Sequence, residues 1–439
     1  MKQLYNFIII FAALALSGCE TFMGKKEKIP LEGHREAVLL SSEEYSLDDS
    51  LKNHIIKLET SEVNQTWAMA GGNAHHVMRP LLLNPDFKLI WEKDIGQGSS
   101  SEHRLLNGPI AVENNVYTID SIGLISSINL TNGEKVWETH SIPSDNASQP
   151  FGGGLAYDQG KIYAATAHAE VLSLDAKTGN ILWRSPTSAP VRAAPTVSDG
   201  RIFIVTINNQ LEVFNENDGQ LLWTHTGIVE AAGLLGGASP AIQTGVIVAP
   251  YSSGEVFALR VENGYPLWSE TLQGSKQLDS VSALSHIKAR PIIDKNMVFL
   301  VSHSGRISAL DMRSGQPIWN RDIGGIRTPA ISGAYLFMLT NDNHLVCLLK
   351  ETGKILWAKQ LEQFMDHEKQ QGKILWAGPL IVNDSLLITG SNKQGLLLSV
   401  KDGNELRRFE LPGRSTLSPI VINKTLLILL DNGTLVAYQ

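Results

Sequence analysis

The sequence predicts an all-β protein, an eight-bladed β-propeller, on the strength of three observations. A Gly-x-x-x-Trp step recurs along the chain. A short apolar strand led by proline or glycine precedes each step, and the period of roughly 45 residues is typical of propellers. The last repeat stops one strand short at Gln439, while an orphan strand that carries Trp91 lies near the other end.

The stretch from Arg306 to Trp319 shows the pattern of one repeat most clearly. Apolar and polar side chains alternate over 306–311, Ser314-Gly315 supplies a turn that accepts positive φ, and the next strand begins at 317. Just upstream, 291–300 holds two apolar runs separated by a polar turn. These runs and the hairpin make about four short strands per repeat.

The repeats keep a common register along the chain. Eight strand starts precede seven ends of the Gly-x-x-x-Trp type, because Gly403 places Arg407 where a seventh tryptophan is expected. The strand starts are Pro109, Gly154, Pro195, Pro240, Pro291, Pro329, Pro379 and Pro419. The intact steps are Gly133 to Trp137, Gly179 to Trp183, Gly219 to Trp223, Gly264 to Trp268, Gly315 to Trp319 and Gly353 to Trp357.

The unequal count predicts how the ring closes. The strand of Trp91 is expected to complete the blade that begins at Pro419, so that N- and C-terminal strands share one sheet. Closed radial repetition leaves only short, protected strand edges. One tryptophan per blade is expected to pack between blades, since a buried aromatic removes about 150–250 Å² from water. Asp175 and Asp311, before their turns, are expected to accept backbone hydrogen bonds.

The first residues predict an export signal. Lys2 precedes an apolar run over 4–16, which is too short to favour a membrane-spanning helix. Leu16-Ser17-Gly18-Cys19 resembles the bacterial lipobox, which implies a signal peptide over 1–18 and acylation of Cys19. Glu20, in place of an aspartate, implies sorting to the outer membrane. An ordinary secretory signal with a chance cysteine is the alternative.

Composition divides the remaining chain into a tether and one domain. Residues 19–64 are mixed and charged and predict a lipid-anchored flexible tether, with apolar pieces at 37–40 and 55–58 that could lie along the propeller at 65–439. The formal charge of −7 argues against nucleic acid as a partner. Cys347, in an apolar run, predicts a buried thiol rather than a disulfide.

The repeat resembles that of the pyrroloquinoline-quinone-type propellers. The motif Ala-Leu-Asp-x-x-Ser/Thr-Gly-x-x-x-Trp occurs at 309–319 and, with Ser173 in place of alanine, at 173–183. Two families share it: the quinoprotein dehydrogenases, and the BamB family of lipoproteins in the machine that folds β-barrels into the bacterial outer membrane. With its lipobox and single propeller, the chain is similar to the BamB family over nearly its whole length. The stretches 67–73, 152–157 and 190–195 look like the alphaproteobacterial branch.

The resemblance implies a non-catalytic scaffold without cofactor or metal, held at the outer membrane and facing the periplasm. It implies BamA, through its POTRA domains, as the main partner within the BAM complex, and leaves open direct contact with nascent outer membrane proteins.

Family contact loops lie between neighbouring blades, and the resemblance selects five candidate partner-binding residues. One family loop carries an arginine before an inner-strand proline; Arg192 matches it, with Val191 and Ala189 as apolar neighbours. A guanidinium offers forked donors to carboxylates or carbonyls, although an arginine that only solvates its loop is the alternative. The next family loop carries two aspartates, where this chain has His286 and Lys288. The partner-binding surface that the resemblance implies therefore differs in charge from that of the family.

Two other functions stay open. A quinoprotein dehydrogenase needs an axial pocket, a calcium ion and a base aspartate, and its family carries adjacent cysteines and long insertions. This chain has no Cys-Cys pair, and Asp279 and Asp366 have no carboxylate cluster beside them. His75-His76 and the other histidines match no catalytic or zinc spacing. A generic envelope scaffold with another partner is the second alternative.

Overall fold

The computed structural model describes residues 45–51, 54–142, 151–230, 233–272 and 285–439. The predicted export signal, Cys19, the apolar piece 37–40 and Asp279 lie outside these residues. The described residues form strands and one 3-10 turn, η2 (Asp49–Leu51). None of their helices has the length and apolar character needed to span a membrane.

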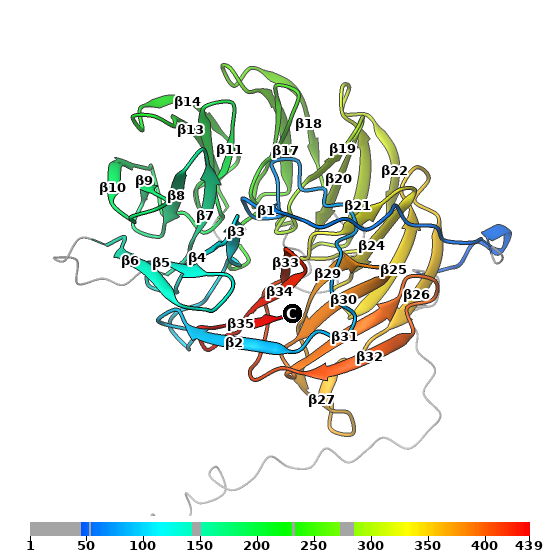
Figure 1. Ribbon diagram of the computed structural model, residues 1–439. Helices are drawn as coiled ribbons and strands as arrows, with labels where there is room; N and C mark the ends of the chain where they lie inside the picture. The colour runs from blue at the N-terminus through cyan, green and yellow to red at the C-terminus, as the bar shows by residue number, and fades with distance from the viewer. Residues whose placement is uncertain (1–44, 52–53, 143–150, 231–232, 273–284) are drawn as a thin grey trace, which may run out of the picture. The chain divides into compact units, whose positions relative to one another are not determined.

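Eight antiparallel sheets surround a common axis, as Figure 1 shows. Short inner strands, buried along their length, lie at the axis, and the tryptophan-bearing strands lie at the rim. The first four blades are β3 (Ile110–Val112), β4 (Asn115–Ile119), β5 (Leu124–Asn129) and β6 (Lys135–His140); β7 (Gly153–Asp158), β8 (Lys161–Thr166), β9 (Glu170–Asp175) and β10 (Ile181–Pro186); β11 (Thr196–Ser198), β12 (Arg201–Val205), β13 (Gln210–Asn215) and β14 (Leu221–Thr226); and β15 (Ala241–Gln243), β16 (Val246–Pro250), β17 (Glu255–Arg260) and β18 (Pro266–Thr271).

The other four blades repeat this order, and one hairpin projects between two of them. The hairpin is β27 (Phe364–Asp366) and β28 (Gln371–Lys373). The blades are β19 (Ile292–Asp294), β20 (Met297–Ser302), β21 (Arg306–Asp311) and β22 (Pro317–Arg321); β23 (Ala330–Ser332), β24 (Tyr335–Leu339), β25 (His344–Leu349) and β26 (Ile355–Gln360); β29 (Trp376–Val382), β30 (Ser385–Gly390), β31 (Gln394–Ser399) and β32 (Glu405–Glu410); and β33 (Ile420–Ile422), β34 (Thr425–Leu429), β35 (Thr434–Tyr438) and β2 (Leu89–Asp94).

The predicted closure of the ring is confirmed. Strand β2 pairs antiparallel with β35, with Trp91 opposite Ala437 and Asp94 opposite Thr434. The two ends of the propeller therefore share one sheet, and the eighth blade has its fourth strand. Because this pairing joins residues more than 300 positions apart, it fixes the ring as a single cooperative unit.

The tryptophans pack between blades, as the sequence predicts. In seven of them, the indole Nε1 donates a hydrogen bond to a backbone carbonyl in the turn between the third and fourth strands of the next blade. Asp175 and Asp311 accept backbone N–H bonds from Thr178 and Ser314, so their predicted role in the turns is confirmed. The seven indole bonds are Trp91 to Leu130 at 2.9 Å, Trp137 to Ala176 at 3.0 Å, Trp183 to Glu216 at 3.3 Å, Trp223 to Val261 at 3.1 Å, Trp268 to Met312 at 2.9 Å, Trp319 to Lys350 at 2.8 Å and Trp357 to Val400 at 2.8 Å.

Arg407 takes the place of the tryptophan at the junction between the seventh and eighth blades. Its guanidinium donates to the carbonyl of Pro85 at 2.6 Å and lies over the ring of Phe87, 4.4 Å from the centroid. Phe87 stands four residues before Trp91, which is the position that glycine takes in the other blades. The Gly–Trp contact is therefore replaced here by a Phe–Arg cation–π contact.

Residues 54–83, which we call the strap, run around the inner-strand ends on one face of the ring (Figure 1). Strand β1 (Thr66–Trp67) within it pairs with β3. The strap bonds main chain to main chain with later blades: Ala68 O accepts from Tyr157, Ala74 O from Ile242, His75 O from Ile293, and Leu81 N donates to Ile381 O. Part of the predicted tether belongs to it, since Ile56 and Leu58 pack against the core.

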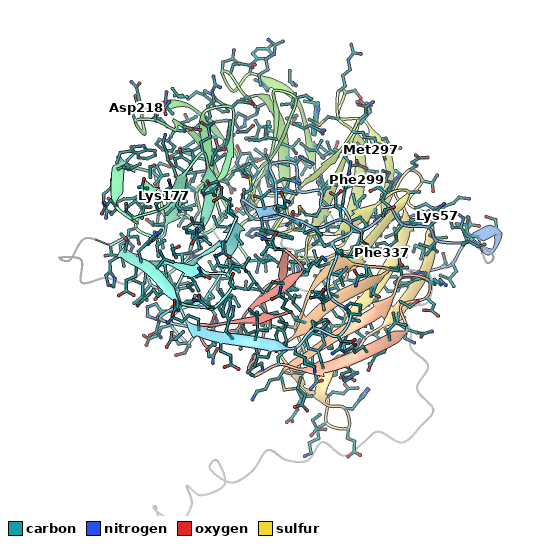
Figure 2. All side chains as sticks on the ribbon, in the orientation of Figure 1. Lys57, Lys177, Asp218, Met297, Phe299 and Phe337 are labelled. Atoms are coloured by element: carbon teal, nitrogen blue, oxygen red, sulfur yellow. The ribbon has the colours of Figure 1, made fainter. Side chains whose placement is uncertain are left out.

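The core lies between the blades. Phe299 and Phe337, 1% and 0% exposed, sit within neighbouring sheets, whereas Asp218 lies at the outer edge of the ring in Figure 2. Cys347 is wholly buried and unpaired, as predicted, and burial raises the pKa of its thiol. With no disulfide among the described residues, packing and strand pairing hold the ring together.

Candidate functional site

The five predicted partner-binding residues lie in two loops on one face of the ring. Ala189, Val191 and Arg192 lie between β10 and β11, and His286 and Lys288 precede β19. Both loops lead to the start of an inner strand, whereas the strap bonds to the turns that follow the inner strands of the last two blades, at Asn383 and Asn423. We call the face that carries these loops the loop face; it lies opposite the strap.

Arg192 is held in place by its neighbours. Its guanidinium carbon lies 5.4 Å from the centroid of the Phe151 ring, and its carbonyl accepts a hydrogen bond from Asn107 Nδ2 at 3.2 Å. Among the described residues, no carboxylate forms an ion pair with it. Its charge is therefore available to a partner, while the cation–π contact limits the freedom of its side chain.

Val191 and Ala189 support the loop rather than extend from it. Val191 is 0% exposed, and its backbone N–H donates to the carbonyl of Thr166 at 3.0 Å. Ala189 is half-buried, and its carbonyl accepts from Thr187 Oγ1 at 2.9 Å. The side chain of Val191 therefore cannot reach a partner in this conformation, because the surrounding blades enclose it.

His286 and Lys288 have different surroundings although they are two residues apart. His286 is 5% exposed and its Nδ1 accepts from the backbone N–H of Leu234 at 2.8 Å, so the ring proton is on Nε2. Burial, with the charge of Lys288 nearby, lowers the pKa of His286 to about 4. His286 and Arg192 line one cavity of about 230 Å³, whereas Lys288 lines a larger one on the ring axis.

Sequence reasoning missed three exposed apolar residues in this region: Ile207, which lines the same cavity as Arg192, and Ile228 and Val229, in the loop after β14. Ile207, Ile228 and Val229 are 45%, 60% and 64% exposed, and together we call them the apolar loop surface. The backbone N–H of Ile207 donates to Pro190 O at 3.0 Å, which ties it to the loop of Arg192. In the sequence, Ile207 follows Val205 and Thr206 as a further strand residue would, so no local pattern indicated that its side chain is exposed. Exposed apolar residues mark interaction sites where they lie together, and the bond from Asn209 Nδ2 to the carbonyl of Ile228 links the turn of Ile207 to the loop of Ile228 and Val229.

Two residues that the sequence raised as metal or catalytic candidates, His76 and Asp366, have structural partners. His76 is buried within the strap, and its Nδ1 contacts the carbonyl of Pro291 at 2.7 Å. Burial lowers its pKa to about 3. Asp366, on the projecting hairpin, accepts from the backbone N–H of Lys369 at 3.0 Å. The part of the chain that the structure describes contains no group of three His, Cys, Asp or Glu residues placed to hold a metal ion.

Sequence comparison identifies the family. The sequence model of the family described as "Outer membrane protein assembly factor BamB" matches residues 121–359 and 324–439. The chain belongs to the BamB family. The BamB of Yersinia pestis is 25% identical over 357 residues, which cover 80% of this chain and 88% of that protein. The BamB of Escherichia coli K12 is 26% identical over 350 residues, which cover 78% and 86%. The alphaproteobacterial branch stays a prediction.

Solved structures share the ring with this family member. The crystal structure of BamB from Moraxella catarrhalis has a TM-score of 0.69 at 17% identity and covers 80% of this chain and 99% of that one. A europium-containing methanol dehydrogenase has a TM-score of 0.66 at 15% identity and covers 83% and 89%. At such identities the likeness shows the fold alone. An assembly factor and an enzyme share this ring, so BamB membership rests on the sequence match.

Proposed function

We propose that this chain is a non-catalytic scaffold in the assembly of outer membrane proteins, and that acylated Cys19 holds it at the outer membrane facing the periplasm. The observation that carries the proposal is the match to the BamB family over most of the propeller. A closed ring with a preformed loop face suits this role, because a scaffold presents a surface and needs no reacting groups.

We further propose that the partner is BamA, engaged through its POTRA domains by the apolar loop surface and Arg192. Protein interfaces place apolar anchors at their centre and favour arginine beside them. Ile228 and Val229 project from the loop after β14, and Arg192 lies in the preceding loop on the same face. The buried His286 bonds to the backbone N–H of Leu234, further along the loop that carries Ile228 and Val229.

Binding of purified chain to a POTRA fragment of BamA tests this proposal by calorimetry. Ile228→Asp places a charge at the proposed centre of the contact and is expected to weaken binding at least tenfold. Arg192→Glu is expected to act in the same direction. The matched control is Leu406→Asp, since Leu406 is also 60% exposed but lies on β32 at the outer rim. Equal affinities for the Ile228 variant and the control would remove the apolar loop surface from the proposal.

A further inference from the structure

A blind cavity of about 720 Å³ lies on the ring axis and opens on the loop face. Lys288 and Arg327 line both this cavity and a smaller one of about 100 Å³ that lies next to it. Trp67 and Gly71 of the strap line that smaller cavity, so the strap closes the axis at the other end of the inner strands. A volume of several hundred Å³ is typical of sites for small molecules.

The axial cavity is strongly cationic in a chain whose formal charge is −7. One carboxylate, Asp431, is among the residues that line it, and it is already engaged: it accepts from Thr416 at 2.7 Å and lies 3.7 Å from Arg414. Four of the cations lie in loops that lead into four different blades, and the fifth lies in the turn between β30 and β31. The cationic residues of the lining are Arg104, Lys288, Arg327, Lys393 and Arg414.

The arginines buried around the axis donate to neutral partners. Arg327 Nε donates to the carbonyl of Trp376 at 3.0 Å, and Arg290, which lines the smaller cavity, donates to Thr328 Oγ1 at 3.2 Å. Within the described ranges, neither these arginines nor Lys288 forms an ion pair with a carboxylate. Burial, with the charge of Arg327 nearby, lowers the pKa of Lys288 to about 8 and that of Arg290 to about 10. Burial lowers the pKa of Arg327 itself to about 10, and the negative charge of Asp431 opposes this shift only in part.

Unpaired buried charge is unfavourable, so its concentration at one place calls for a counter-charge. The apolar walls, which include Leu106, Ile326 and Leu417, strengthen the field of the cations, because attraction increases as the local dielectric falls. From this geometry we propose that the axial cavity binds a small multivalent anion through Lys288 and Arg327, with carboxylate or phosphate groups as its charged ends.

Titration calorimetry on the full chain, with inorganic pyrophosphate and with citrate at constant ionic strength, tests the proposal. At least one of the anions is expected to bind saturably. Binding of citrate alone assigns carboxylates as the recognised groups, binding of pyrophosphate alone assigns phosphates, and binding of both shows that charge is sufficient for recognition.

Variants locate the binding. Arg327→Gln and Lys288→Gln are each expected to weaken it at least tenfold, whereas Lys177→Gln, in the exposed turn between β9 and β10 (Figure 2), is expected to change it less than twofold. Removal of an unpaired charge is expected to leave the melting temperature without anion equal or higher, which checks that the variants fold. Absence of saturable binding by both anions, or equal affinity in the Lys288 variant and the parent, would overturn the proposal.

Discussion

Single atoms decide how neighbouring blades meet. At Gly353, whose φ is +66°, an added Cβ would lie 2.5 Å from Cε3 of Trp319 in the preceding blade. Glycine is therefore required at this position for two reasons: the positive φ of its backbone, and the space that the indole occupies. At Gly200 only the first reason applies, because its φ is +72° and no atom lies within 4 Å of an added Cβ.

This difference predicts unequal effects of the same substitution. Gly200→Ala costs about 1–2 kcal/mol for the left-handed conformation alone. Gly353→Ala is expected to lower the free energy of unfolding by about 1–3 kcal/mol more, because the methyl group overlaps the indole. Denaturant unfolding of both variants measures the difference. Equal losses would show that Trp319 moves aside without cost.

His286 predicts a pH dependence of stability. Its folded pKa of about 4 lies below the unfolded value near 6.5, so the unfolded state binds more protons between these limits. Stability is therefore lost as pH falls from about 6.5 towards 4, and protonation also removes the acceptor for Leu234. Lys288 and His303 add repulsion to the imidazolium form.

The check compares the parent with His286→Asn, whose side-chain oxygen keeps an acceptor but does not titrate. Between pH 7 and pH 5 the parent is expected to lose about 1–2 kcal/mol more of its free energy of unfolding than the variant. Parallel pH profiles would contradict a neutral, buried His286.

Among the elements, the strap has no counterpart in the repeat. It gives backbone hydrogen bonds to inner strands of several blades, and Trp67, 6% exposed, joins the core of the closing blade. A chain that starts at Asn84 keeps every blade and the carbonyl of Pro85 but loses these bonds. Its melting temperature is expected to fall by at least several degrees relative to a chain that starts at His54. Equal melting temperatures would show that the blades hold the ring without the strap.

The repeat could be predicted from the sequence because its signals are local. Turn glycines, strand alternation and the spacing to tryptophan occur within a few residues, and the count of starts and ends gave the pairing of Trp91 with the last blade. For the strap, the sequence indicated only that the apolar piece 55–58 could lie along the propeller. The rest escaped prediction because its partners lie in distant blades and its strand has two residues. Periodicity carries no information about such a segment.

At the scale of the whole molecule, the candidate site was predicted only in part. The position of Arg192 in a loop between blades followed from the family resemblance. The burial of Val191 and His286, the exposure of Ile228 and the convergence of Lys288 with Arg327 depend on how loops from separate blades meet. These contacts form only in the closed ring, because each of them joins loops from different repeats.

The two faces of the ring are built differently. The strap face is tied to the blades by main-chain bonds, and the loop face carries both the apolar loop surface and the mouth of the axial cavity. We therefore propose that partners bind at the loop face, and the rim strands, such as β32, serve as a surface for comparison.

Site-specific photocrosslinking in the native host tests the central claim most directly. A photoreactive amino acid at position 228 is expected to crosslink to BamA, and the same amino acid at position 406, equally exposed on the rim, is expected to give no BamA adduct. Crosslinking to BamA from position 406 but not from position 228, or from neither position, would contradict a scaffold that engages the assembly machinery through its loop face.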